Sequence, residues 1–232
     1  MMYKEETIKR YTEKACSMLA EKLLSADRIK LHLSYGNKKI GKTLNFNLPA
    51  ILTCGGMCKK CGCYKYCYAI KDALRFPAVM RARVENLALL LKFPGLYWSQ
   101  VRDAIRRHKS YEYIRFHVSG EIQSIEYFAE LVKTARLFPE RVFWTYTKQY
   151  EIVNAYCAKN GGRSAIPKNL SVMFSDWDGY PMDNKNTFPV FQFVPAEKTA
   201  PAGVYHCPGN CDICKASGRG CMNRESACVM EH

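Results

Sequence analysis

Apolar residues recur along the chain at two spacings, one typical of helices and one typical of strands. Residues 4–24 place apolar side chains three and four positions apart, which predicts an amphipathic helix. Residues 29–33 and 44–48 instead alternate apolar and polar positions around a Gly36-Asn37 turn. This alternation predicts a pair of strands or a hairpin that leads into the next part of the chain.

Beyond residue 69, helical and strand-like stretches follow one another in turn. The helical stretches are residues 69–92, interrupted at Pro77, then 96–109, 125–137 and 149–159. The strand-like stretches are residues 111–118, 142–147, 170–174 and 188–194. Strands joined by helices of this length predict right-handed βαβ units and a parallel sheet. With 232 residues, the chain suits a partial parallel (β/α) barrel better than a complete one of about 250 residues.

The composition changes after Pro195, where Pro, Gly, Cys and charged residues replace the apolar pattern. A segment of this composition cannot build a core alone, and we expect it to fold around a metal. We therefore divide the chain into residues 1–199, a partial α/β barrel with an N-terminal helix, and residues 200–232, a cysteine-rich extension.

Ten of the twelve cysteines lie in two short windows that share the spacing C-x3-C-x2-C. The first loop, residues 54–67, holds Cys54, Cys58 and Cys61, followed by Cys63 and Cys67. The cysteine-rich extension at residues 200–232, called the tail below, holds Cys207, Cys211 and Cys214, followed by Cys221 and Cys228. Three thiolates on so short a loop can converge on one iron-sulfur cluster, and nearby glycines allow the tight turns. Of the other two, we expect Cys16 and Cys157 to be small buried apolar side chains.

Composition and charge narrow the environment and the partners. No apolar run is long enough to span a membrane, and the start resembles no export signal, so we expect a reducing cytoplasm. Lys and Arg number 35 against 21 Asp and Glu, which gives a net charge of +14. This excess favours an anionic partner, of which nucleic acid is the first candidate. Tyrosines among lysines in the first loop suit stacking with unpaired bases, although tyrosines beside strands more often pack into a core.

Polar residues stand where the predicted parallel strands end, the edge at which ligands bind in such sheets. One strand ends in His117 and continues through Ser119-Gly120-Glu121, and the next is followed by Lys148. Ser124 is expected to cap the following helix. His117, Glu121 and Lys148 remain candidates for a site.

The first loop, together with Ser119-Gly120-Glu121 after the next strand, resembles the radical SAM superfamily. That resemblance implies a [4Fe-4S] cluster held by Cys54, Cys58 and Cys61, with S-adenosylmethionine on the open iron. It further implies that Ser119, Gly120 and Glu121 contact the cofactor amine, and that Lys148 or His117 faces the substrate. Two positions depart from the pattern: Lys60 stands where an aromatic residue is usual, and Ser119 replaces a glycine.

A second resemblance covers most of the chain. It rests on residues 36–42, 46–49, Thr53-Cys54, Cys67-Tyr68-Ala69, 115–121 and 146–148. These stretches resemble the gene product 88 family of phages and prophages, and this resemblance implies the cytoplasm of a host cell if the protein is encoded by a phage. The family pattern implies Cys54, Cys63 and Cys67 as ligands in the first loop, and Cys207, Cys211, Cys214 and Cys221 in the tail.

The metal stays open between iron and zinc, because C-x2-C pairs suit tetrahedral zinc as well as clusters. A disulfide framework in the tail is the less favoured alternative. The leading hypothesis is an iron-sulfur protein with two [4Fe-4S] clusters, a radical SAM-like enzyme that acts on nucleic acid or an associated substrate. The alternatives are a nucleic-acid-binding module with structural metals, and a redox carrier or sensor that does not use S-adenosylmethionine.

Overall fold

The computed structural model describes residues 2–177, 180–195 and 197–230, and it divides the chain into two compact units. Unit 1 comprises residues 1–34, 45–110 and 117–121, and unit 2 comprises residues 35–44, 111–116 and 122–232. Among the described residues, no helix has the length and apolar character needed to cross a bilayer. Each unit is described separately below.

Unit 1 is mainly helical. Its helices are α1 (Glu5–Leu23), α2 (Met57–Lys60), α3 (Tyr68–Arg75), α4 (Pro77–Lys92) and α5 (Pro94–Arg107), with 3₁₀ turns η1 (Ala26–Arg28) and η2 (Cys63–Tyr66). The predicted helix at 4–24 and the interruption at Pro77 are confirmed. Because proline has no amide hydrogen, it is tolerated in the first turn of a helix and so begins both α4 and α5.

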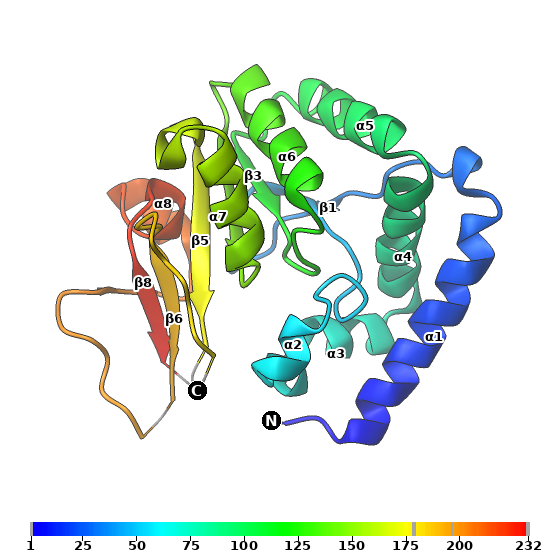
Figure 1. The fold of residues 1–232 in the computed structure, drawn as a ribbon, viewed down its shortest axis with the longest axis horizontal. Coiled ribbons are helices and arrows are strands. Elements are labelled where there is room, and N and C mark those ends of the chain that lie inside the picture. The colour runs from blue at the N-terminus through cyan, green and yellow to red at the C-terminus, as the bar shows by residue number, and fades with distance from the viewer. Residues whose placement is uncertain (1, 178–179, 196, 231–232) are drawn as a thin grey trace. The chain divides into compact units, whose positions relative to one another are not determined.

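The core of unit 1 forms where α1 packs against α3 and α4 (Figure 1). Ile8, Tyr11 and Ala15 on α1 are buried against Ile70 and Val84, and the Tyr11 hydroxyl donates to the Ala50 carbonyl over 3.0 Å. The predicted apolar face of α1 is therefore correct. The prediction for Cys16 is wrong, because this residue follows the buried Ala15 on the helix and is exposed.

The expected strand at residues 29–33 is also wrong, since the described strand β1 is Ser34–Tyr35. The backbone of the preceding segment is satisfied by side chains of helices instead of by a neighbouring strand. Asn86 accepts from the His32 amide and donates to the His32 carbonyl, and Gln100 accepts from the Leu31 amide. An alternating pattern can thus mark an extended segment that lies outside any sheet.

The sheet has eight strands in the order β1-β2-β3-β4-β5-β6-β8-β7. Beyond β1 they are β2 (Thr43–Phe46), β3 (Tyr113–Phe116), β4 (Val142–Thr147), β5 (Leu170–Asp176), β6 (Val190–Val194), β7 (Tyr205–His206) and β8 (Ala227–Met230). The strand pairs β3–β4, β4–β5, β5–β6, β6–β8 and β7–β8 are all parallel. The mixed α/β class and the mostly parallel sheet are therefore confirmed.

In unit 2, the helices α6 (Ile125–Leu137) and α7 (Tyr150–Lys159) connect β3, β4 and β5, and a 3₁₀ turn η3 (Gly162–Ala165) follows α7. They lie on one face of these strands (Figure 1), where Phe128 and Tyr156 make an edge-to-face contact at 5.1 Å. Ser124 caps α6 by accepting from the Tyr127 amide, as predicted. Cys157 on α7 is fully buried, also as predicted.

The tail contributes elements that the sequence pattern did not indicate. These are β7, the helix α8 (Cys211–Ser217), the 3₁₀ turn η4 (Cys221–Asn223) and β8. Cys214 and Met222 from the tail pack against Trp144 of β4, together with Val142 and Tyr146 of the same strand. Because alternate residues of a strand share a face, the tail covers one face of β4 through positions 142, 144 and 146. The tail is thus part of the sheet and of the core of unit 2.

Candidate metal centres

The first loop follows β2 after a short connecting segment, and this segment and the loop hold unusual backbone conformations. Ile51 adopts φ +64°, which is rare for a β-branched residue, and Gly55 and Gly62 have φ +63° and +73°. A strained residue persists only where its surroundings enforce it, and such residues cluster at functional sites. The strained Ile51 therefore lies just before the segment that carries the five cysteines.

The pKa of Cys54 is affected by several charged and hydrogen-bonding groups around this loop. Cys54 donates a hydrogen bond to Cys58, which raises the pKa of Cys54 well above its usual value and lowers the pKa of Cys58. Burial and the charges of Glu121 and Cys67 raise the pKa of Cys54 further. Cys54 thus neighbours Cys58 from one predicted ligand set and Cys67 from the other.

Cys61 and Cys63 lie beside the same short helix. Their sulfur atoms are 3.6 Å and 4.0 Å from the Cys58 carbonyl oxygen. Among the described residues, no three His, Cys, Asp or Glu side chains are already arranged as a metal site. Both ligand sets consequently require the loop to adjust around a bound metal, as is common for sites that fold with their metal.

The Ser119-Gly120-Glu121 segment is anchored on the backbone of Leu48. The Ser119 hydroxyl donates to the Leu48 carbonyl over 2.8 Å, and the Ser119 amide donates to Asn47 Oδ1 over 3.1 Å. Gly120 has φ +92°, and a Cβ atom there would lie 2.7 Å from that of Leu48. Glu121 is buried and raises the pKa of Cys54, so this segment belongs to the surroundings of the first loop.

The two proposed substrate-facing residues belong to different units. His117, in unit 1, is buried, has φ +61°, and donates its amide to the Phe46 carbonyl. Lys148, in unit 2, donates to Ser175 Oγ over 2.9 Å, and its ammonium lies 5.4 Å from the centre of the Trp177 ring. Each side chain lies at the carboxyl end of a strand, as the sequence pattern indicated.

Secondary structure brings the tail cysteines to one side of the sheet. The Cys207 amide donates to the Cys228 carbonyl over 2.8 Å, so β7 pairs with β8 up to this cysteine. Cys211 and Cys214 lie one turn apart on α8, whose first turn is capped by Asn210. Cys221 opens η4, and its carbonyl accepts from Ser171 Oγ of β5 over 2.5 Å.

The four tail thiols lie within electrostatic reach of one another. Burial raises the pKa of Cys221 to about 12, and the charges of Cys207, Cys211 and Cys214 act in the same direction. Burial also raises the pKa of Cys211, again with contributions from Cys214 and Cys207. The four thiols therefore lie near enough to influence one another's pKa, but in the described part of the chain no three of them are arranged as a metal site.

Hydrogen-bond donors and a cation surround these thiols. Tyr146 hydrogen-bonds Cys221, Tyr205 Oη lies 3.5 Å from Cys214 Sγ, and the charge of Arg115 favours the thiolate form of Cys211. None of the three was singled out from the sequence. One feature of the sequence could have indicated Arg115: it is a charged residue between the apolar Ile114 and Phe116 of a predicted strand.

The side-chain types of the tail fit a metal centre, and, as in the first loop, the thiols would have to move closer around the bound metal. Four thiols on short turns are the ligands of [4Fe-4S] clusters and of structural zinc. A bound metal would replace the thiol protons, and the resulting anionic centre would find Arg115 and hydroxyl donors already in place. Gly220 leaves room for this packing, since a Cβ atom there would lie 3.3 Å from Cys214 Sγ. Cys228 and His206 are neighbours in β8 and β7 and stay outside the proposed set.

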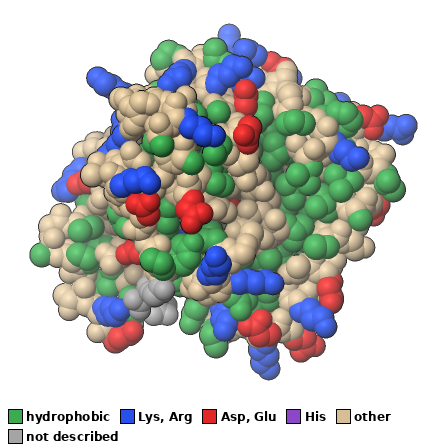
Figure 2. Space-filling view, in the orientation of Figure 1, with side chains coloured by type: hydrophobic (Ala, Val, Ile, Leu, Met, Phe, Trp, Pro, Cys, Tyr) green, Lys and Arg blue, Asp and Glu red, His purple; other side chains and the backbone are tan. Residues whose placement is uncertain are grey.

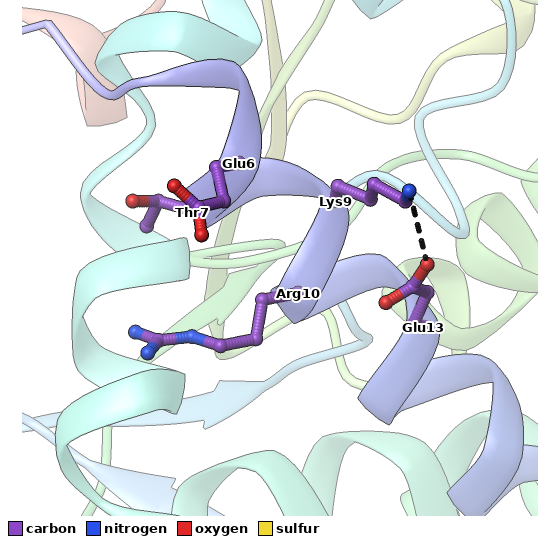
Figure 3. Close-up of a pocket in the computed structure, with 5 residues that line it drawn as sticks. All are labelled: Glu6, Thr7, Lys9, Arg10 and Glu13. Carbon is purple, nitrogen blue, oxygen red and sulfur yellow. Dashed lines mark ion pairs between the residues drawn. The ribbon is translucent and has the colours of Figure 1, made fainter.

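Two hollows in unit 1 differ in character. One lies on the outward side of α1, where Lys9 and Glu13 form an ion pair at 3.9 Å and Arg10 points elsewhere (Figure 3). Its lining residues all come from one solvent-exposed face of α1, so we do not consider it a candidate site. The other is a cavity of about 270 Å³ lined mostly by apolar atoms, including Asn47 and the buried Arg83. Asn47 also holds the Ser119 amide, so this cavity lies close to the Ser119-Gly120-Glu121 segment.

Comparison with known proteins gives a family. Neither a curated protein nor a solved structure shows a significant match to the chain. The model of the gene product 88 family matches residues 22–200, which include the first loop and strands β1 to β6 and stop before Cys207. Because this match covers most of the chain, the protein belongs to the gene product 88 family.

Proposed function

We propose that the protein is an iron-sulfur protein with two cysteine-ligated centres, one in the first loop and one in the tail. The observation that carries the proposal is the packing of Cys211 and Cys214 on the face of β4 that holds Trp144 and Tyr146, where the Arg115 guanidinium also lies over the Tyr146 ring. Four cysteines complete the ligation of one [4Fe-4S] cluster, so the tail centre would stabilise the fold or relay electrons. Zinc in the same four thiolates is the alternative metal.

The first loop is the candidate reactive centre. Cys54 belongs to both ligand sets, with Cys58 and Cys61 in one and Cys63 and Cys67 in the other. A three-cysteine set would leave one iron open to S-adenosylmethionine, which supplies radical chemistry when a reduced cluster cleaves its sulfonium bond. Support comes from Glu121, which is buried and whose charge raises the pKa of Cys54. In this proposal Glu121 would contact the cofactor amine.

The finer fold that accompanies this function is a partial parallel barrel of the radical SAM type. Parallel pairing from β3 to β6 and the connections through α6 and α7 support it. Lys148 or His117, at the carboxyl ends of β4 and β3, is the residue proposed to face the substrate. These roles are tested by measuring substrate turnover by the metal-loaded protein in the variants His117→Asn and Lys148→Gln. Both variants leave the cysteines intact.

Nucleic acid is the proposed substrate class, or the ligand of a binding module if the metals are structural. Lys and Arg side chains are scattered over the visible surface instead of forming one stripe (Figure 2). Near the first loop, however, aromatic and basic side chains are exposed together: Tyr66, Phe76, Lys59, Lys60 and Lys71. Rings among cations suit stacking with unpaired bases and contact with phosphates. Retention on single-stranded DNA or RNA should fall steeply with salt, and its absence at low salt removes this part of the proposal.

The deciding experiment is anaerobic purification followed by measurement of iron, sulfide and zinc per chain. Two [4Fe-4S] centres give about eight irons, and Cys54→Ser or Cys221→Ser should each leave about four. Cys157→Ser is the matched control, because Cys157 is buried on α7 away from both windows, and should leave the metal content unchanged.

Electron paramagnetic resonance of the reduced protein, with and without S-adenosylmethionine, then separates the functions. A spectrum altered by the cofactor in wild type and restored to the cofactor-free form by Glu121→Ala supports the radical SAM-like enzyme. A full complement of iron with no response favours the redox carrier or sensor. Zinc without iron would refute the iron-sulfur proposal and leave the structural binding module.

A further inference from the structure

Arg115 is a cation placed on the sheet face that the tail covers. It pairs in register with Trp144, so both side chains project from the same face. Its guanidinium lies 4.9 Å from the centre of the Tyr146 ring and 6.0 Å from that of Trp144. Such contacts with aromatic faces hold a guanidinium in a fixed position.

No carboxylate of the described residues balances the charge of Arg115. Its Nε atom is buried without a hydrogen-bond partner, and among the described residues no Asp or Glu forms an ion pair with it. Arg115 as a whole is half-buried, and a cation partly removed from water without an anionic partner carries a desolvation cost. The groups that do lie near Arg115 are Tyr146 and the Cys211 thiol.

Metal-bound thiolates would supply the missing anion. Four thiolates carry a charge of −4, and either Zn²⁺ or a [4Fe-4S]²⁺ core adds +2, so the centre is a dianion. Tyr146 completes the arrangement, because it contacts Arg115 through its ring and Cys221 through its hydroxyl. The paired strands β3 and β4 thus place a cation, Arg115, near Cys211 and a hydrogen-bond donor, Tyr146, near Cys221.

We infer that Arg115 and Tyr146 are positioning residues of the tail metal centre. Arg115 acts as its counter-cation at Cys211, and Tyr146 orients the Cys221 thiolate by donating to its sulfur. The inference rests on the proposed tail centre and adds the protein groups that retain its metal. Groups around metal ligands typically change metal affinity by about 10–100-fold when removed.

The test uses the full chain with Cys54→Ser as background, so that the tail is the remaining centre. The variants are Arg115→Gln, Arg115→Lys and Tyr146→Phe, and the control is Lys133→Gln, which removes an exposed cation on α6. The measured quantity is the rate at which an anaerobic chelator removes the metal. We expect Arg115→Gln to speed the loss about tenfold or more, Tyr146→Phe to speed it less, and Arg115→Lys to restore much of the retention. Lys133→Gln should have no effect.

A second measurement does not depend on metal release. If the metal is iron, loss of the positive charge in Arg115→Gln should move the midpoint potential to a more negative value, whereas Arg115→Lys should leave it close to the parent value. Circular dichroism verifies that each variant is folded, and if Arg115→Gln does not fold, Arg115→Lys and Tyr146→Phe carry the test.

The possible failures are distinguishable. A background protein without metal refutes the proposed tail centre and this inference together. A background protein that holds its metal, with Arg115→Gln and Tyr146→Phe releasing it at the parent rate, refutes only the roles of these two residues. Equal acceleration by Lys133→Gln would also refute them, because any lost cation would then have the same effect.

Discussion

The amide of Cys211 donates to the carbonyl of Lys39 over 2.7 Å, which joins the first turn of α8 to the loop between β1 and β2. Lys215 donates to the neighbouring Ile40 carbonyl over 3.2 Å and to Asp212 over 2.9 Å. A tail cysteine is therefore positioned by a turn near the other end of the sequence.

This contact predicts that Gly41→Ala damages the tail centre. Gly41 has φ +64°, and a Cβ atom there would lie 1.9 Å from Asp212 Oδ1. The backbone strain alone costs roughly 1–3 kcal/mol. We expect a lower free energy of unfolding in urea and less metal in the tail. Gly95→Ala, where nothing lies within 4 Å of the new Cβ, should change stability by less than about 1 kcal/mol. Equal effects of the two variants would contradict the role of the turn.

The anchored Ser119-Gly120-Glu121 segment predicts that Gly120→Ala damages the first centre. The new methyl group would overlap Leu48, at 2.7 Å from its Cβ and 2.9 Å from its carbonyl oxygen. We expect Gly120→Ala to lower the free energy of unfolding by roughly 1–3 kcal/mol. In a Cys221→Ser background, which lacks the tail centre, we also expect less iron in the first loop. Gly56→Ala is the control, because φ is ordinary there and no atom lies within 4 Å. Unchanged iron in Gly120→Ala would show that the segment is not part of the site.

Serine variants identify the ligands of the first loop. In the Cys221→Ser background, Cys54→Ser should abolish iron binding whichever ligand set is used. We expect Cys63→Ser and Cys67→Ser to do the same, since the family resemblance selects these two, whereas Cys61→Ser should retain iron. The reverse outcome would assign the C-x3-C-x2-C set. Iron and sulfide per chain are the quantities to measure.

The raised pKa of Cys221 predicts how the metal-free protein responds to alkali. Burial raises this pKa from 9.0 to about 12, so between these pH values the folded state holds a proton that the unfolded state releases. Stability contributed by this thiol is therefore complete below about pH 9 and is lost as the pH rises toward 12. Urea unfolding of the chelated protein at pH 8 and pH 10.5 should show a larger loss for wild type than for Cys221→Ser. Equal losses would mean that the thiol is not buried when the metal is absent.

The sequence predicted the elements whose periodicity is long and regular. The strand at 142–147 and the helix at 125–137 have the predicted boundaries, because their apolar residues are buried by the sheet and by neighbouring helices. The tail elements could not be predicted in this way. Strand β8 has four residues and β7 has two, which is too short for a periodic signal.

The candidate sites divide in a similar way. Spacing alone drew attention to both cysteine windows, since ligands close in sequence must be close in space. The relation of Arg115 to Cys211 and of Tyr146 to Cys221 is not predictable from the sequence, because it depends on strand register and on the tail folding back over β4. Contacts of this kind are set by tertiary structure, and a single sequence has no local pattern that records them.

The position of β8 between β6 and β7 has a consequence for synthesis of the protein. A ribosome delivers residues 207–221, and with them every tail cysteine of the proposed set, before it delivers Ala227–Met230. Until β8 is made, β7 has no neighbour with which to pair, and Cys207 lacks its hydrogen bond to the Cys228 carbonyl. A nascent or truncated chain could therefore contain all four thiols and still lack the strand that brings the first of them to the other three.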